Sequence, residues 1–203
     1  MKKFITVLML LLTISLTACG SSKSLYYPGI QTTTGYKSTY FGFTFTTPSG
    51  YRLLSRESII KETKMPLDAN SATYAEDAIE YGKDNPVYEM MALHNTTGAN
   101  VIVACCPYKP TGSDMKNDIE YLKTFLQNYM GTPVTQKDTT TEIAGKEYLS
   151  FTVTNTQDYA TLYHELFVST LEDKMVLICI TWEDGEESSR EVMIDAFSAI
   201  TAE

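Results

Sequence analysis

Thiols can form disulfides, bind metals or accept a covalent group, and the sequence has four of them. Cys105 and Cys106 are adjacent, Cys179 lies in an apolar run, and Cys19 stands apart near the start. Redox and metal sites need closely spaced ligands such as Cys-x-x-Cys, which does not occur here. In an oxidising exterior Cys179 could pair with Cys105 or Cys106, or those two could form a strained bridge. Three cysteines cannot all pair, which favours small buried hydrophobic residues instead.

Histidines and acidic residues could bind a metal ion, but their spacing does not favour it. His94 and His164 are the only histidines, and they form no His-x-x-x-His pattern. A Ca²⁺ loop needs oxygen ligands at alternating positions, and only Asp184-Gly185-Glu186 hints at one. We therefore predict no metal site and interpret two acidic clusters as solvated helix ends that could still receive a basic partner. The clusters are Glu76, Asp77, Glu80 and Asp84, and Glu183, Asp184, Glu186, Glu187 and Glu191.

Catalytic and cofactor motifs are likewise missing from the sequence. No Gly-x-Ser-x-Gly, phosphate loop or dinucleotide fingerprint occurs. Ser58-Ile59-Ile60-Lys61 and Ser113-Asp114-Met115-Lys116 match Ser-x-x-Lys, but lack the companion motifs of penicillin-binding enzymes. The sequence predicts no catalytic and no cofactor-binding residue.

Tyrosine is abundant, with fourteen copies against one tryptophan. Tyrosines supply amphipathic contact area and are enriched at recognition surfaces. We expect most of them to be half-buried in sheet and helix positions, although a groove lined by tyrosine would suit a binding module. They are Tyr26, Tyr27, Tyr36, Tyr40, Tyr51, Tyr74, Tyr81, Tyr88, Tyr108, Tyr121, Tyr129, Tyr148, Tyr159 and Tyr163.

Composition excludes several classes of protein. The 203 residues are 43% hydrophobic and 11% aromatic, which is unlike a disordered chain. Four cysteines are too few for a disulfide scaffold. A net charge of −9 argues against a nucleic-acid partner. One globular domain with a hydrophobic core is the expectation for this size.

The first 18 residues have the pattern of an export signal. Lys2 and Lys3 precede an uncharged stretch at 4–16, too short for the roughly 20 residues of a spanning helix. The segment Leu16-Thr17-Ala18-Cys19 resembles the lipobox of bacterial lipoproteins. The resemblance implies cleavage after Ala18 and a diacylglyceryl group on Cys19, with an N-acyl chain as a possible addition. Two acyl chains anchor a protein stably, so the expected location is the bacterial cell membrane, facing outside the cytoplasm. An ordinary secretory signal with an incidental cysteine is the alternative.

Processing at this position changes the net charge and leaves a short segment ahead of the domain. Loss of residues 1–18 removes Lys2, Lys3 and no acid, so the net charge becomes −11. Residues 19–39 are small and polar, and we predict a lipidated cysteine followed by a flexible tether. Four residues of this segment are large and apolar or aromatic, and they could dock onto the domain: Leu25, Tyr26, Tyr27 and Ile30.

Residues 40–203 are predicted to form that single domain. Phe41, Phe43 and Phe45 alternate with small or polar residues, which predicts a strand with one buried face. Helices are expected over 56–64, where Ser55 is the N-cap, and over 72–81, where Thr73 and Glu76 fit a capping box. Strands at 87–94 and 99–106 form a hairpin, because residues 95–98 are rich in Asn and Gly.

The second half of the domain is predicted as a long helix, four strands and a final helix. The helix covers 114–130, with an apolar face of Met115, Ile119, Leu122, Leu126 and Tyr129. The strands cover 134–143, 146–154, 161–171 and 174–182, and the apolar run at 175–180 makes the last one central. The closing helix spans 186–199, with a buried stripe of Val192, Met193, Ala196, Phe197 and Ile200. This order predicts an α+β fold, an antiparallel sheet with helices packed on it.

Residues 37–201 resemble the PsbP-like family, which includes photosystem accessory proteins and Ran-binding Mog relatives. The resemblance rests on Tyr40-Phe41-Gly42-Phe43-Thr44-Phe45-Thr46-Thr47-Pro48 and on Ile143-Ala144-Gly145-Lys146-Glu147-Tyr148 before the last strands. The family often has Trp after the proline, where this chain has Tyr51. The resemblance implies a fold and a non-enzymatic accessory role, and it transfers no catalytic residue.

Together these features predict a lipid-anchored extracytoplasmic binding or accessory protein. Its partners would be the membrane, through the lipid on Cys19, and an envelope protein or small ligand held in a groove between sheet and helices. The first alternative is a cell-envelope hydrolase or another envelope enzyme, which a Ser/His/acid set or a pair of carboxylates in one pocket would favour. A structural subunit of an envelope complex is the second alternative.

Overall fold

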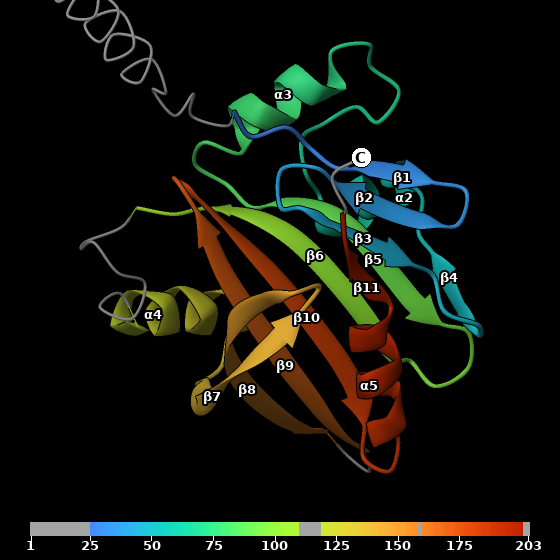
Figure 1. Ribbon diagram of the computed structural model, residues 1–203, viewed down its shortest axis with the longest axis vertical. Coiled ribbons are helices and arrows are strands. Elements are labelled where there is room, and N and C mark those ends of the chain that lie inside the picture. Colours follow the sequence, from blue (N-terminus) through green and yellow to red (C-terminus); the bar gives the residue numbers. More distant parts are fainter. Residues whose placement is uncertain (1–24, 110–118, 158–159, 201–203) are drawn as a thin grey trace, which may run out of the picture.

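Two antiparallel sheets and four helices make up the part of the chain that the computed structural model describes, residues 25–109, 119–157 and 160–200 (Figure 1). The larger sheet is long and strongly twisted. Its seven strands run in the spatial order β4 (Tyr51–Leu53), β5 (Val87–His94), β6 (Asn100–Pro107), β10 (Lys174–Glu183), β9 (Ala160–Leu171), β8 (Lys146–Gln157) and β7 (Thr135–Ile143).

The smaller sheet joins the two ends of the described chain. β3 lies between β2 and β11, and Phe197 of β11 pairs with Phe45 of β3. Backbone hydrogen bonds from Thr46 N to Ala196 O and from Ile200 N to Gly42 O extend this contact. The four strands are β1 (Ile30–Thr32), β2 (Gly35–Ser38), β3 (Phe43–Thr46) and β11 (Phe197–Ala199), in that order.

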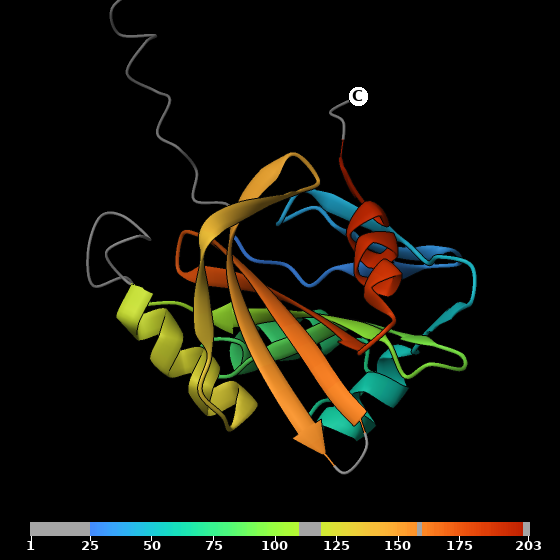
Figure 2. The same cartoon turned by 90° about the horizontal axis from the view of Figure 1, so that it is seen from below.

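The helices cover both faces of the larger sheet, as the second view shows (Figure 2). Leu122 and Leu126 of α4 pack on one face, and Ile59 of α2 packs on Met91 of β5, the strand next to the edge strand β4. Met193 of α5 packs on the other face, together with the smaller sheet and α3. The bounds are α2 (Arg56–Thr63), α3 (Tyr74–Tyr81), α4 (Ile119–Met130) and α5 (Glu187–Asp195).

Strand β10 is the centre of the larger sheet because both of its faces are apolar. Val176, Ile178 and Ile180 belong to the hydrophobic cluster under the smaller sheet. Leu177 and Cys179 belong to the cluster under α4. Successive side chains of a strand point to opposite faces, so only a nearly unbroken apolar run can be buried on both. The predicted central position of this strand is confirmed.

The tight turn between β7 and β8 lies where the sequence places it. Ala144 and Gly145 have φ angles of 52° and 74°. Positive φ at both central residues is the geometry that matches the twist of a two-residue hairpin. Gly145 adopts this conformation freely, whereas Ala144 is held there by the pairing of Ile143 with Lys146.

The flexible tether predicted for residues 19–39 is wrong for its described part, residues 25–39. β1 and β2 lie within it, and Tyr26 and Tyr36 are only 5% and 1% exposed. The polar composition concealed this because every second side chain points inward while the others face solvent. Residues 1–18 and 19–24, with the predicted signal and Cys19, lie outside the described residues.

Two predictions about helix ends are also wrong. The closing helix stops at Asp195 and not at residue 199, because Phe197–Ala199 pairs with β3. Within its predicted stripe, Met193 and Phe197 are buried but Val192 is exposed. In α3 the Thr73 side chain donates to Asp77 and makes no cap bond, so the capping box with Glu76 does not form.

The predicted α+β fold, an antiparallel sheet with helices packed on it, is confirmed. Helices 56–63 and 74–81 and the strands of the long meander begin or end within a few residues of their predicted limits. Ser55 caps α2, since its Oγ accepts a hydrogen bond from Ser58 N at 3.2 Å. Met115 lies outside the described residues. No helix in the described ranges is both long and apolar enough to cross a membrane.

Candidate functional site

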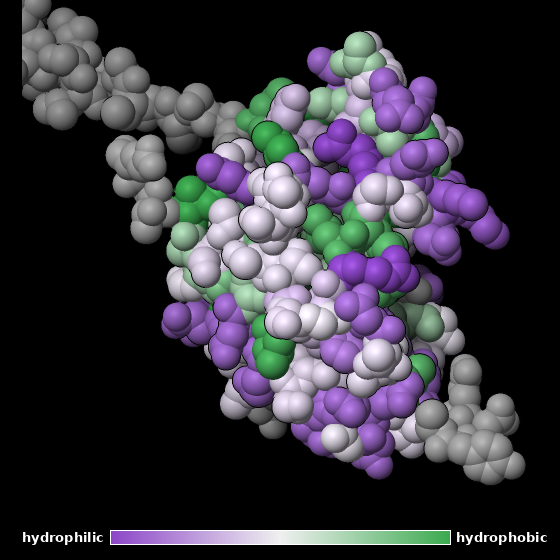
Figure 3. All heavy atoms as spheres, turned by 90° about the vertical axis from the view of Figure 1, so that its right-hand side faces the viewer, coloured by the Kyte–Doolittle hydropathy of each residue, from purple (hydrophilic) through white to green (hydrophobic). Residues whose placement is uncertain are grey.

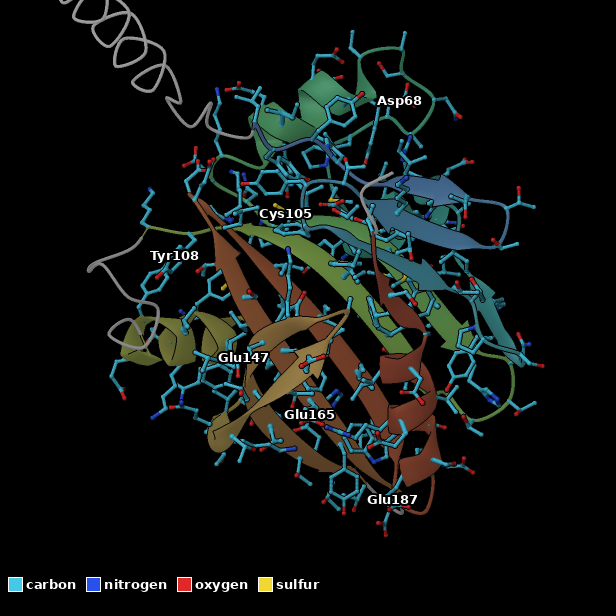
Figure 4. The ribbon with its side chains drawn as sticks, in the orientation of Figure 1. Asp68, Cys105, Tyr108, Glu147, Glu165 and Glu187 are labelled. Atoms are coloured by element: carbon cyan, nitrogen blue, oxygen red, sulfur yellow. The ribbon has the colours of Figure 1, made fainter. Side chains whose placement is uncertain are left out.

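A cavity of about 310 Å³ lies between the larger sheet and α5, and we call it the Glu165 pocket. Glu165 lies in the lower half of the molecule in Figure 4, between β7 and α5. Four strands and one helix contribute to its walls. The lining residues are Lys137 of β7, Thr152, Val153 and Thr154 of β8, Tyr163, His164 and Glu165 of β9, Trp182 of β10 and Arg190 of α5.

Strand register brings the polar side chains of this pocket onto one face. Glu165 pairs with Thr152 of β8, and Tyr163 pairs with both Thr154 of β8 and Trp182 of β10. Directly paired residues of antiparallel strands project to the same side of the sheet. Helix α5 crosses that side and adds Arg190.

Glu165 is fully buried, and two cations neutralise its charge. It accepts a hydrogen bond from Lys137 Nζ at 2.5 Å and another from Arg190 Nε. Burying an unpaired carboxylate costs several kcal/mol, and the two partners offset this cost together. The hydrogen bond to Glu165 raises the pKa of Arg190, which keeps the guanidinium charged. The Lys137 and Arg190 side chains are 39% and 21% exposed, so both cations also reach the solvent side of the pocket.

Trp182 adds a donor whose acceptor is missing. The residue is 8% exposed, and no described residue accepts a hydrogen bond from its Nε1. A buried N–H without an acceptor costs about 1–3 kcal/mol. The ring of Tyr163 is stacked on Trp182, with centroids 5.8 Å apart and an interplanar angle of 22°. Tyr163 donates to Asp184 Oδ1 at 3.3 Å, and the charge of Asp184 raises the pKa of the phenol.

His164 does not join Glu165, although the two are adjacent in sequence. Its Nδ1 lies 2.9 Å from Thr181 Oγ1, on the face that also carries Leu166 and Cys179. Burial lowers the pKa of His164, which favours the neutral ring. His94 lies in the β5–β6 hairpin, where its Nδ1 accepts from Thr97 N at 3.2 Å. Within the described residues no group of three or more His, Cys, Asp or Glu side chains could hold a metal ion.

The three cysteines of the domain are free and buried. Cys105 and Cys106 pair with Val176 and Met175, whereas Cys179 pairs with Ile102. Cys179 is thus three or more positions along the ladder from either neighbour, roughly 10 Å, which is too far for a bridge. The hypothesis of a disulfide to Cys179 is therefore wrong. The three cysteines are better interpreted as small buried hydrophobic residues. Burial raises the pKa of Cys106 to about 12 and that of Cys179 to about 11, so neither is a ready nucleophile.

The acidic clusters are solvated, as interpreted from the sequence. Glu76, Asp77 and Glu80 are exposed on α3. Asp184 and Glu187 are exposed around the start of α5, and Figure 4 shows Glu187 at its lower end. Neither Ser58 nor Lys61 lines the pocket. Glu165 is the single carboxylate among the lining residues of the pocket.

A second buried carboxyl, Glu89 of β5, is absent from the sequence-based candidates. Tyr26 and Tyr36 donate to it at 2.8 and 2.5 Å, and Gly29 N donates at 2.6 Å. Burial raises the pKa of Glu89. Glu89 and Glu165 share one signal that sequence reasoning could have used: each is the single acidic residue of its strand, with apolar residues nearby.

Comparisons with known proteins find similarity to solved structures alone. No family model matches the chain, and no curated protein matches it. The solution structure of cyanobacterial PsbP (CyanoP) from Synechocystis sp. PCC 6803 is 13% identical, with a TM-score of 0.43 over 91% of this chain and 99% of that one. LpqN, involved in cell envelope biogenesis of Mycobacterium tuberculosis, is 9% identical, with a TM-score of 0.42 over 85% and 90% of the two chains.

A third similar structure is the Saccharomyces cerevisiae Ran-binding protein Mog1p. It is 12% identical, with a TM-score of 0.44 over 87% of this chain and 97% of that one. Identities this low concern the fold alone.

Proposed function

We propose that this chain is a lipid-anchored extracytoplasmic binding or accessory protein that takes a small polar ligand in the Glu165 pocket and catalyses no reaction. The pattern of residues 1–19 supports the anchor, with Cys19 as the lipid attachment residue. The pocket supports the binding role, because it lies between sheet and helix and gathers polar groups from five elements.

The observation that carries the proposal is the state of the one carboxylate in the pocket. Glu165 is fully buried and held by Lys137 and Arg190. Hydrolysis of a glycosidic bond ordinarily needs two carboxylates that flank the scissile bond. Acyl transfer by a serine or cysteine needs a base within hydrogen-bond reach, and the ring of His164 is on the opposite face. This arrangement suits recognition better than chemistry.

The ligand class follows from the groups that the pocket leaves available. Lys137 and Arg190 offer partly exposed cations, and Trp182 also lines the pocket. Thr152 contributes a hydroxyl, and Tyr163 contributes a ring face. A small molecule with several hydrogen-bond acceptors fits these donors. Because Glu165 already neutralises one of the two cations, the site favours a neutral or singly negative ligand over a multiply charged one.

The single tryptophan of the chain allows a direct test. Trp182 lines the pocket, so its fluorescence reports occupancy. We expect a saturable change with at least one compound of a panel of monosaccharides, amino acids, peptidoglycan fragments and inorganic phosphate. Calorimetry on the Lys137→Met variant should then show affinity reduced by roughly tenfold, the loss of one charge-assisted hydrogen bond. Lys123→Met is the matched control, since Lys123 pairs with Glu120 on α4 outside the pocket.

Two results would overturn the binding proposal. The first is the absence of any saturable response in the whole panel. The second is hydrolytic turnover of a panel compound by the wild-type chain that disappears in Glu165→Gln, which would favour an envelope hydrolase.

The anchor is tested separately by labelling cells with palmitate. Wild type should incorporate label, and Cys19→Ala should not, because the thiol of Cys19 is the proposed attachment atom. Cys106→Ala should keep the label, since Cys106 is buried in the domain. Equal labelling of wild type and Cys19→Ala would disprove the lipid assignment.

A further inference from the structure

Exposed apolar side chains are concentrated in one short segment. Leu25, Tyr27 and Ile30 are 80%, 54% and 57% exposed. Among the described residues, one other large hydrophobic residue is exposed: Val192 on α5, at 43%. We call the three side chains the N-terminal apolar patch. Figure 3 views the molecule from the right-hand side of Figure 1, and hydrophobic groups lie there among hydrophilic ones.

The patch stands on a segment that is fixed to the domain. Between its members, Tyr26 and Gly29 turn inward and donate to Glu89 at 2.8 and 2.6 Å. The Tyr26 ring meets Tyr40 edge-on, with centroids 5.4 Å apart. After Ile30, the side chain of Gln31 donates to Leu54 O at 2.9 Å. The inward residues therefore hold the outward ones in a constant direction.

The distance along the chain places the patch close to the anchor. Five residues, 20–24, separate Cys19 from Leu25. Six Cα–Cα steps span at most roughly 21 Å when fully extended. If Cys19 carries lipid, as proposed above, the patch cannot lie farther than this from the bilayer surface. Leucine and isoleucine side chains gain free energy on entering the interface, and tyrosine is a typical interfacial residue.

Charges around the patch indicate which force attracts it. Glu76, Asp77 and Glu80 are exposed on the neighbouring helix α3. Arg56 lines a small cavity beside Tyr27 and Ile30, with its guanidinium 4.0 Å from the centre of the Tyr74 ring. This surface offers no cluster of free cations among its described residues. Attraction to a bilayer would therefore be apolar and strongest without anionic lipid.

We propose that Leu25, Tyr27 and Ile30 insert into the interface of the bilayer that holds the lipid on Cys19, an inference that rests on the proposed anchor. The domain then sits on the membrane in one orientation. The segment with the patch and α3 lies at the upper end of the molecule in Figures 1 and 4, and Glu165 lies toward the lower end. Docking by the patch leaves the Glu165 pocket directed away from the membrane and open to ligand.

Quenching of tryptophan fluorescence by brominated lipid measures this contact. The lipidated full chain is placed in phosphatidylcholine vesicles with bromine on the acyl chains. The reporter variant carries Trp182→Phe and Tyr27→Trp, and the control carries Trp182→Phe and Tyr163→Trp at the far end. We expect quenching of the Tyr27→Trp reporter to exceed that of the control by roughly threefold or more.

Removing the apolar side chains tests the patch itself. Leu25→Ser with Ile30→Ser in the reporter background should bring quenching down to the control value. Val192→Ser is the matched control, because it removes an exposed apolar side chain outside the patch, and it should change nothing. Adding anionic lipid should lower quenching of the reporter at low salt, with recovery at high salt.

Failure of the docking and failure of the anchor give different results. Mass spectrometry and flotation with vesicles first establish whether Cys19 carries lipid. A chain that is lipidated and floats, but whose two tryptophan reporters are quenched equally or not at all, overturns the docking alone. A chain without lipid overturns the anchor and the docking together.

Discussion

Two buried carboxyls show how single residues shape this protein. Glu165 is balanced by the charges of Lys137 and Arg190, so burial does not leave it isolated. Among the described residues, Glu89 has no charged partner in hydrogen-bond contact and instead accepts from two phenols and one amide. For Glu89 burial prevails over those hydrogen bonds, and its pKa is raised. The two acids are therefore stabilised in different ways.

Glu89 should make stability decline as pH rises. Its pKa is higher in the folded chain than the ordinary value near ~4.3, so the folded state binds a proton more tightly than the unfolded state. Glu89 contributes its full stabilisation to the free energy of unfolding below pH ~4.3. This stabilisation is lost as the pH rises to the raised pKa, at no more than about 1.4 kcal/mol per pH unit. Urea unfolding between pH 4.5 and 8 should show this slope in wild type and lose it in Glu89→Gln. The exposed Glu76→Gln control should keep it, and an unchanged slope in Glu89→Gln would contradict the argument.

Arg190 should matter for stability more than a surface arginine does. Arg190→Gln leaves buried Glu165 with Lys137 as its one remaining cation. Breaking a buried ion pair costs about 3–5 kcal/mol, and the partial exposure of Arg190 together with the remaining lysine reduces this to roughly 2 kcal/mol. Arg52→Gln, at an exposed position of β4, should change the free energy of unfolding by less than about 0.5 kcal/mol. Equal effects of the two substitutions in urea unfolding would refute the role of the buried pair.

At the scale of elements, the ends of helices depend on the residues just beyond them. Helix α2 ends at Thr63, and its C-cap Lys64 has left-handed φ and ψ angles of 56° and 30°. This conformation commonly ends a helix, but glycine adopts it at least cost. Helix α5 ends because Phe197 leaves the helical path to pair with Phe45 of β3. The first ending is a local backbone preference, whereas the second depends on a strand more than a hundred residues away.

Lys64→Gly should stabilise the protein. Removing the side chain relieves the left-handed strain at the end of α2, and we expect a gain of about 0.5–1 kcal/mol in the free energy of unfolding. Lys61→Gly, inside the same helix, should instead cost about 1 kcal/mol. Thermal melts of both variants measure the two effects, and a loss of stability in Lys64→Gly would show that its side chain makes a contact worth more than the strain.

At the scale of the whole molecule, the smaller sheet makes the two ends of the described chain part of the core. β1 and β2 precede residue 40, and β11 lies near the C-terminal end. Tyr26, Tyr36 and Phe197 pack in the same cluster as the central strand β10. Burial of three large aromatic side chains contributes several kcal/mol, comparable with the net stability of a domain.

Truncation tests this boundary. A chain starting at residue 40 loses β1, β2 and the three hydrogen-bond donors to Glu89, and it should fail to unfold cooperatively. A chain starting at residue 25 keeps all of these and should melt like one starting at residue 19. Circular dichroism melts and limited trypsin digestion distinguish the two. Cooperative melting of the chain that starts at residue 40 would contradict this argument and support the domain boundary at residue 40 that the composition predicts.

The sequence predicted strands β3 and β10 but missed strands β1 and β2. The alternation of Phe41, Phe43 and Phe45 and the apolar run at 175–180 predicted strands that the structure contains. Both signals are local, since they depend on period and on turn residues. β1 and β2 were missed because they are short and polar on their outer face, and the inward tyrosines become visible only when β3 and Glu89 lie opposite them.

The same distinction holds for the site. Sequence alone determined the export pattern around Cys19, the α+β order of elements and the lack of any recognised catalytic motif, because these are properties of neighbouring residues. Only the tertiary structure decided that Glu165 meets Lys137 and Arg190, that His164 faces away, and that residues 25–39 belong to the domain. The contacts of Glu165 join β7, β9 and α5. The contacts of the smaller sheet join the two ends of the described chain. Strand register and helix packing create them, and no short-range pattern in the sequence records either one.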